Sequence, residues 1–197
     1  MSDPQPAEAV KLIASLFYGD DGMLAEAMAA LCQRYGRADF ISAPVSFAYT
    51  DYYEKEFGIG LIRRFVSFER LIRPEALPDV KNWTNALEKR LSSGGRRGVN
   101  IDPGYLAKAH LILATGKGYT HRPYLREGIY ADLTLMYRDK TFHPLPWTYP
   151  DYAAPEVIGM LSRIRDRYLL QLKGETADDG SGAIEPPGRA ETEDRIP

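Results

Sequence analysis

The sequence contains a single cysteine, Cys32, among its 197 residues. One cysteine excludes an intrachain disulfide and any metal cage built from several thiolates. Because small secreted domains usually depend on disulfides, this scarcity favours a reducing compartment. We therefore expect a cytoplasmic protein.

A hydrophobic run long enough to cross a bilayer is also missing. The N-terminal segment MSDPQPAEAV lacks the basic residues of a secretory signal. The apolar run that follows, VKLIASLFY, is short and contains a lysine. We therefore expect no membrane partner.

The chain has no large excess of basic residues. Its formal net charge is -2, and residues 174–197 hold seven acids against two arginines. The preceding residues therefore carry a small net positive charge. Proteins that coat nucleic acid are usually far more basic, so we do not expect a nucleic-acid partner. Weak basicity is compatible with an anionic small molecule.

The composition is that of a globular protein, with 44% hydrophobic and 11% aromatic residues. The chain is long enough to bury a sizeable core. We expect a single domain over residues 9–173. It is followed by an acidic tail, 174–197, whose few apolar residues predict disorder.

Hydrophobic periodicity predicts helices and strands along the chain. The predicted helices cover residues 23–35, 78–91 and 155–172, and the predicted strands cover 11–18, 40–49, 60–72, 99–101 and 128–137. Residues 106–115 fit either a strand or a helix capped by Asp102, and their Leu-Ile-Leu run favours the strand. In the strand over 60–72, charged positions such as Arg63 alternate with apolar ones.

These elements predict an α+β fold, with one mostly antiparallel sheet covered by helices. The order at the start is β-α-β-β-α-β. The helix over 155–172 has a clear apolar face and should dock on the sheet. Residues 126–128 predict a hairpin turn into the strand over 128–137, in which Ile129, Ala131, Leu133 and Leu135 should share one face.

The stretch ATGKGYTHR, residues 114–122, has the glycines and the lysine of a phosphate-binding loop. A P-loop also needs a glycine five positions before Gly116 and a hydroxyl residue after Lys117. Leu111 and Gly118 occupy those positions. The Asn-Lys-x-Asp motif that reads guanine is missing as well, so the sequence does not predict a GTPase or kinase core.

The three histidines, His110, His121 and His143, are too few and too scattered for a zinc pattern. Paired His-x-Thr motifs and a Gly-x-Ser-x-Gly nucleophile motif are also missing. The sequence therefore assigns no metal ligands and no cofactor, and it leaves open whether the protein is an enzyme.

Cations and polar side chains gather on either side of residues 106–115. Asp-Pro-Gly and Thr-Gly-Lys-Gly both tend to break strands, so we expect their polar neighbours to surround one concave surface at the rim of the sheet. Arginine and lysine suit phosphate or carboxylate. A solvated basic loop would show the same pattern. The predicted ligand-binding residues are Arg96, Arg97, Asn100, Asp102, Lys117 and Arg122.

Two titratable residues are candidates for proton transfer at the same surface. His121 lies among the cations, and imidazole changes charge near neutral pH. Asp132 interrupts an apolar strand, where an unpaired buried carboxylate would be costly. We predict His121 and Asp132 as catalytic residues. The alternative for Asp132 is an exposed position on the wet face of the sheet.

Aromatic residues gather in two further segments. Residues 50–54, TDYYE, are typical of a loop packed by its own tyrosines. In LPWTYPDY, Trp147 and Tyr149 could stack on a base or another ring. Alternatively, the prolines could make this segment a rigid crossover that fixes the C-terminal helix.

Five sequence blocks resemble the bacterial domain of unknown function 4416 family. In chain order they are SFERLIRPEALPDVKNWTNALE, RRGVNIDPGYL, LILATGKGYTHRPYL, GIYADLTLMY and PLPWTYPDY. The likeness covers most of residues 9–173. The family brings no established activity, and this chain lacks the motifs that the GTP-binding label of some members would require. The resemblance implies that the acidic tail lies outside the family body.

Two functions of different classes follow. The first is binding of an anionic, nucleotide-like or phosphorylated ligand at a basic site. The alternative is a noncatalytic protein-interaction or adaptor domain that uses its tyrosine-rich surface. Cations that converge in a cleft would favour the first function, and a flat aromatic patch would favour the second. The oligomeric state is left open.

Overall fold

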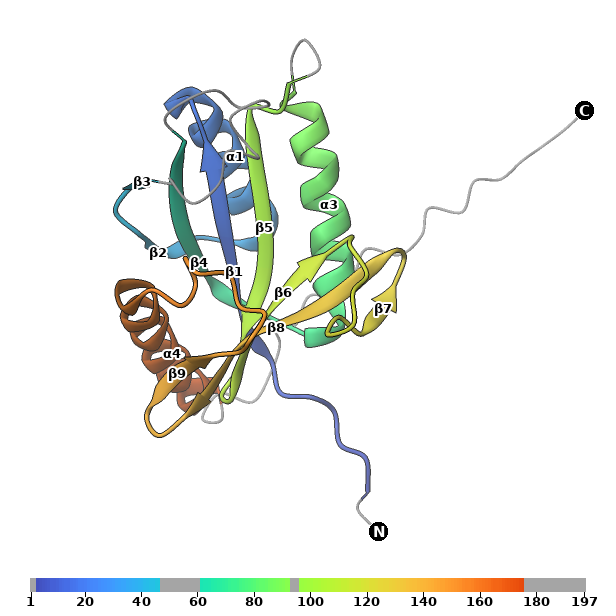
Figure 1. Ribbon diagram of the computed structural model, residues 1–197, viewed down its shortest axis with the longest axis vertical. Coiled ribbons are helices and arrows are strands. Elements are labelled where there is room, and N and C mark those ends of the chain that lie inside the picture. Colours follow the sequence, from blue (N-terminus) through green and yellow to red (C-terminus); the bar gives the residue numbers. More distant parts are fainter. Residues whose placement is uncertain (1–2, 47–60, 93–95, 176–197) are drawn as a thin grey trace, which may run out of the picture.

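The computed structural model describes residues 3–46, 61–92 and 96–175, which form an α+β fold around one sheet of nine strands (Figure 1). All pairings between the described strands are antiparallel. The main order is β2-β4-β1-β5-β6-β8-β7, with β3 beside β4 and β9 beside β8. The strands are β1 (Val10–Tyr18), β2 (Ala38–Ile41), β3 (Val45–Ser46), β4 (Ile62–Ile72), β5 (Val99–Leu106), β6 (His110–Thr115), β7 (Tyr124–Arg126), β8 (Ile129–Arg138) and β9 (Thr141–Pro144).

Helices cover both faces of the sheet. α1 and α3 pack on one face against the even-numbered residues of β1, and α4 packs on the other face. Figure 1 shows α1 and α3 in the upper half of the view and α4 at the lower left. The predicted α+β class and the docked C-terminal helix are confirmed. The helices are α1 (Asp21–Tyr35), the short η1 (Pro74–Ala76), α3 (Leu77–Arg90) and α4 (Pro155–Glu175).

β1 is central, and all nine of its residues are buried. This burial includes Lys11, whose ammonium group needs a partner when it is removed from water. Lys11 Nζ pairs with the carboxylate of Asp39 and donates to Gln171 Oε1 over 2.6 Å. Burial lowers the pKa of Lys11, and Asp39 opposes that shift.

The ends of α1 follow the signals in its sequence. Asp20 Oδ1 accepts a hydrogen bond from the backbone N–H of Met23 over 3.1 Å, which satisfies one free donor of the first turn. Gly36 has a φ of 89°, a conformation that side chains disfavour, and it ends the helix. Residues next to the helix in the sequence thus set both of its ends.

β5 continues through residues 102–104, the Asp-Pro-Gly segment that we expected to break it. The expectation was wrong because the nitrogen of Pro103 points to an edge of β5 that needs no N–H for strand pairing. Ile101 donates its N–H to Glu88 Oε1 over 2.7 Å and accepts from Lys81 Nζ over 3.0 Å, so this edge of β5 faces α3. Pro103, two residues later, points its nitrogen to the same edge, and pairing with β6 begins only at the next residue. Proline is tolerated at an edge of this kind.

The strand interpretation of residues 106–115 is confirmed, since β5 ends at Leu106 and β6 begins at His110. The hairpin turn into β8 is confirmed too. Glu127 and Gly128 have φ angles of 54° and 77°. Two central residues with positive φ are typical of a tight turn whose twist matches that of the flanking strands.

The single strand predicted over residues 40–49 was wrong. The ladder stops at Ile41 because the next hydrogen bond is made by a side chain. Phe65 donates its N–H to Ser42 Oγ over 3.0 Å and not to a backbone carbonyl. Pro44 then precedes the two-residue strand β3. Residues 47–49 lie outside the described residues.

The face assignment within β8 was also wrong in part. A register shift between Leu111 and Ile112 pairs them with Leu135 and Leu133, which leaves one residue of β8 unmatched. A bulge of this kind breaks the alternation of a strand. Leu135 therefore packs in the core beneath α4, whereas Ile129 packs against α3's first residue in a separate cluster.

Some predictions concern parts of the chain that the structure does not describe. The aromatic cluster over residues 50–54 lies outside the described residues, as do residues 176–197. The single domain over 9–173 and the disordered tail therefore stay predictions. Among the described helices, none is both long and apolar enough to cross a membrane.

Candidate functional site

β8 places Asp132 against the loop that carries His121 and Arg122. Arg122 Nε donates to Asp132 Oδ2 over 2.8 Å, and His121 Nε2 lies 3.9 Å from the same oxygen. Arg122 Nη1 also donates to the carbonyl of Lys117 over 3.2 Å, which holds the loop in a tight turn. The structure thus brings together three residues that were predicted from separate segments.

Asp132 is buried, with 7% of its surface exposed, so the alternative of an exposed position on the wet face was wrong. A buried carboxylate is tolerated here because it is paired with a guanidinium. Burial opposes the charge of Arg122, but hydrogen bonds with Asp132 and Tyr149 outweigh this effect and raise the pKa of Arg122. Arg122 therefore stays charged at neutral pH.

Aromatic rings surround this pair. His121 stacks on Trp147, with ring centroids 4.8 Å apart and an angle of 15° between the planes. Tyr119 meets the His121 ring edge-on at 5.3 Å. The indole N–H of Trp147 donates to the carbonyl of Leu133 on β8 over 2.8 Å, so the ring is held in place.

Parts of these rings remain open to solvent. Trp147 is 39% exposed and Tyr149 is 56% exposed. Exposed rings beside cations can hold a planar anion by stacking and charge together. We name this region the aromatic-basic surface, formed by Lys117, Tyr119, His121, Arg122, Asp132, Trp147 and Tyr149.

The two ring nitrogens of His121 have different surroundings. Nε2 is buried on the side of Asp132 and has no hydrogen-bond partner among the described residues. Nδ1 is not enclosed in this way. The His121 side chain as a whole is 12% exposed.

The other predicted ligand-binding residues form a second group at the open edge of β5. Arg97 Nη1 donates to Asn100 Oδ1 over 2.8 Å and to Glu88 Oε2 over 3.2 Å. Asn100 Nδ2 donates to Asp102 Oδ2 over 2.8 Å, and Lys81 Nζ donates to Asp102 Oδ1 over 3.2 Å. We name these five residues the β5-edge network.

The β5-edge network closes the edge that β6 leaves unpaired. Glu88 and Lys81 reach from α3 to the backbone of Ile101 and are almost fully buried. Burial raises the pKa of Glu88, and Lys81, the N–H of Ile101 and Arg97 oppose this shift. Because each carboxylate accepts hydrogen bonds from within the group, the network has a structural explanation without a ligand.

Strand pairing places the two groups near each other in the sheet. Gly104 on β5 pairs with Leu113 on β6, which pairs with Asp132 on β8, and Asp102 lies two residues before Gly104. Ordinary strand spacings separate the Cα atoms of Asp102 and Asp132 by roughly 12 Å. A single concave surface shared by both groups stays a prediction.

Two further predicted cations are exposed at the surface. Arg96 is exposed beside residues that the structure does not describe. Lys117 is exposed in the loop before Tyr119 and His121. Both side chains could reach a ligand at the surface.

Sequence reasoning missed a buried cation, Arg63 on β4. We had placed it among the charged positions that alternate with apolar ones, but it is 3% exposed. Its Nε donates to Ser15 Oγ over 2.7 Å, and it forms an ion pair with Asp151. Its guanidinium also lies over the ring of Tyr152, 4.5 Å from the centroid. The signal available in the sequence was the alternation of residues along the strand, which places Arg63 on a face that points into the protein.

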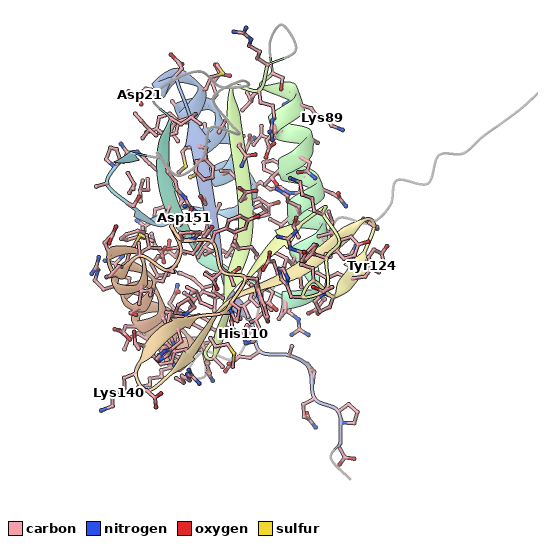
Figure 2. All side chains as sticks on the ribbon, in the orientation of Figure 1. Asp21, Lys89, His110, Tyr124, Lys140 and Asp151 are labelled. Atoms are coloured by element: carbon pink, nitrogen blue, oxygen red, sulfur yellow. The ribbon has the colours of Figure 1, made fainter. Side chains whose placement is uncertain are left out.

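Arg63 anchors one end of the segment 145–154, and Trp147 anchors the other end on β8. The chain between β9 and α4 crosses the front of the sheet in Figure 1. In Figure 2, Asp151 lies on the β1–β4 side of the sheet and Tyr124 lies at the opposite side, on β7. The strand β9, which precedes this segment and pairs with β8, was not predicted from the sequence.

The Tyr152 hydroxyl is enclosed beneath this segment. It has no hydrogen-bond partner of good geometry among the described residues, although Ser15 lies near it. Burial raises the pKa of Tyr152, with Arg63 acting in the opposite direction, so the hydroxyl keeps its proton. It is a donor without an identified acceptor.

Residues 3–46, 61–92 and 96–175 contain no cluster of three or more histidine, cysteine, aspartate or glutamate side chains that could hold a metal ion. The pairs formed by His121 with Asp132 and by His143 with Asp139 each have only two such members. The chemistry of the aromatic-basic surface is thus that of cations, one carboxylate, one imidazole and exposed rings.

Comparison with known proteins gives one match. The family described as domain of unknown function DUF4416 matches residues 8–168, which include the β5-edge network, the aromatic-basic surface and the segment that crosses the sheet. No curated protein and no solved structure matches the chain. The resemblance seen in the sequence blocks is confirmed, and the chain belongs to the DUF4416 family.

Proposed function

We propose that the protein binds an anionic ligand with a planar ring, such as a nucleotide or another phosphorylated aromatic compound, on the aromatic-basic surface. The observation that carries this proposal is the stack of His121 on a Trp147 ring that is itself fixed and partly exposed. A ring already held in place loses little conformational entropy when a second ring stacks on it.

Charge supports the same ligand class. Lys117 and Arg122 lie in one short loop, in which Arg122 pairs with Asp132 and donates to the carbonyl of Lys117. Lysine is a compact point charge that can meet a phosphate. Because the guanidinium of Arg122 is engaged by Asp132, its main effect on a ligand is to hold the loop and to add to the local potential.

The adaptor alternative is favoured by a different observation. Five of the eight large hydrophobic residues that are exposed among the described residues lie at this end of the sheet: Tyr119, Tyr124, Leu125, Trp147 and Tyr149. Aromatic residues are enriched at protein interfaces. A protein partner would use this whole set, including Tyr124 and Leu125 on β7, whereas a small ligand would use only the rings next to Lys117.

Binding can be tested by calorimetry with adenosine monophosphate, adenosine and inorganic phosphate at low ionic strength. Trp147 emission gives a second readout in a Trp83→Phe background. We expect adenosine monophosphate to bind more tightly than either of its parts, because ring and anion contribute together. Trp147→Ala should weaken binding about tenfold or more, since stacking on an aromatic side chain is worth about 1–3 kcal/mol.

A matched pair of lysine variants tests the role of charge. Lys117→Gln should weaken adenosine monophosphate binding several-fold, whereas Lys140→Gln, in the exposed turn at the other end of β8, should not. Equal affinity in both variants would remove the charge argument. If none of the three probes binds, the anionic-ligand proposal fails and the adaptor alternative gains weight.

A further inference from the structure

We propose that His121 determines which ligand charge the aromatic-basic surface accepts: the anion binds with the imidazole protonated, and up to one proton is taken up on binding. This inference rests on the proposed function, and it adds a specificity-determining residue to it. It predicts a preference for more strongly anionic ligands and tighter binding at lower pH.

The formal charges show why one imidazole matters here. Arg122 and Asp132 form an ion pair at 2.8 Å and cancel each other. Lys117 is exposed in the same loop. Protonation of His121 adds one full positive charge to the surface that an approaching anion meets.

The orientation of the ring gives the effect a direction. Nε2 faces the carboxylate of Asp132 at 3.9 Å, and a neutral imidazole has one nitrogen with a proton and one with a lone pair. A carboxylate favours the proton on Nε2, which leaves the lone pair on Nδ1. That lone pair repels the oxygen of an anion. Protonation converts Nδ1 into a donor that an anion can accept from.

Groups from several elements face the ring and act on its charge in opposite directions. Asp132 from β8 favours the imidazolium, and Trp147 from the crossing segment can hold a cation on its face. Arg122 from the same loop opposes the charge, and so does the removal of the ring from water. Tyr119 contributes a neutral ring edge. A bound anion would add the extra negative charge that tips this balance.

The chain contains a matched comparison in His143. Its Nε2 is also buried without a hydrogen-bond partner in the described residues, and it lies 4.0 Å from Asp139 Oδ2. The carboxylate of Asp139 is 84% exposed, and this pair lies at the turn between β8 and β9. His143 therefore has the same kind of partner without the aromatic-basic surface around it.

The experiment measures binding of adenosine 3′,5′-cyclic monophosphate between pH 6 and pH 8. This probe keeps a single diester charge over that range, so its own titration does not enter. The protonated fraction of an ordinary imidazole falls about 25-fold from pH 6 to pH 8, which sets the scale of the effect. We expect the affinity to fall about tenfold over this range, which corresponds to an average uptake of about half a proton, and calorimetry in buffers of different ionisation enthalpy should show the uptake rising toward one proton near pH 8.

Two variants decide the outcome. His121→Gln should remove the pH dependence and the proton uptake, and His143→Gln should leave both as in the wild type. Binding without pH dependence in the wild type, or pH dependence that survives in His121→Gln, would overturn the role of His121 and leave the proposed site standing. If neither this probe nor adenosine monophosphate binds at any pH, both proposals are overturned.

Discussion

The β5-edge network and the aromatic-basic surface contain the same kinds of residues, arginine, lysine and carboxylate, in two different arrangements. In the network, Glu88 and Lys81 are buried and bonded to the backbone of Ile101. In the surface, Arg122 and Asp132 pair with each other beneath exposed rings. Composition alone does not separate these two arrangements.

The difference teaches where to look for a ligand among polar residues near strand ends. A group whose donors and acceptors are already matched completes the fold, and a ligand would have to break those bonds. A group that leaves a ring, a lone pair or an exposed cation available can gain contacts when a ligand binds. The comparison predicts that variants of the network lose stability and that variants of the surface lose binding.

The largest expected effect is on the network. Glu88→Ala leaves the N–H of Ile101 without its acceptor and Arg97 without its ion-pair partner, and breaking a buried ion pair costs about 3–5 kcal/mol. We expect urea denaturation to show a loss of that size. Lys89→Ala, at the exposed neighbouring position, should change the free energy of unfolding by about 0.5 kcal/mol or less. Similar losses for both variants would break the comparison.

A double-variant cycle tests the surface. Asp132→Leu leaves the Arg122 guanidinium without its partner and should cost about 2–4 kcal/mol in the free energy of unfolding. Adding Arg122→Met should return the stability to within about 1 kcal/mol of the wild type, because apolar replacements for a buried pair are often neutral. Adenosine monophosphate binding should be lost in the double variant. A stable double variant that still binds this probe would show that the pair has only a structural role.

The smallest expected effect concerns pH. Because the pKa of Glu88 is raised by burial, the folded protein keeps this proton to a higher pH than the unfolded chain. The stability that Glu88 contributes is therefore full below its ordinary pKa of 4.5 and is lost as the pH rises through the raised value. Glu88→Gln cannot ionise, so its stability relative to the wild type should improve from pH 4 to pH 7.

Urea denaturation at several pH values measures this trend. Glu26→Gln, at an exposed position of α1, serves as the control and should keep a constant difference from the wild type. A constant difference for Glu88→Gln as well would mean that Glu88 does not titrate differently in the folded protein.

The main helices and strands could be predicted because they depend on local patterns. The cap at Asp20, the stop at Gly36 and the apolar face of α4 all appear in consecutive residues. The continuation of β5 through Pro103 could not be predicted, because it depends on α3 covering the same edge. The register shift between Leu111 and Ile112 could not be predicted either, because register is a property of two paired strands and not of one strand's sequence.

The candidate site was predictable in part. The sequence marked His121 and Arg122 as neighbours and Asp132 as an unusual residue in an apolar strand, and the fold brings these three together. The contact between Arg97 and Glu88 could not be foreseen from the sequence, because Glu88 appeared as an ordinary residue of a predicted helix. The burial of Arg63 depends on Asp151, which lies 88 positions away in the chain.

That separation has a consequence for the order in which the protein assembles. The segment that carries Trp147 and Tyr149 is fastened to β4 by a contact between residues 88 positions apart, and to β8 by one between residues 14 positions apart. Contacts that close long loops form slowly, because the chain loses entropy before it gains energy from the contact. We therefore expect the sheet to fold before the crossing segment settles on it. A chain whose sheet is complete can still lack its binding surface. During refolding, the spectroscopic signal of the folded sheet should therefore recover before the ability to bind ligand.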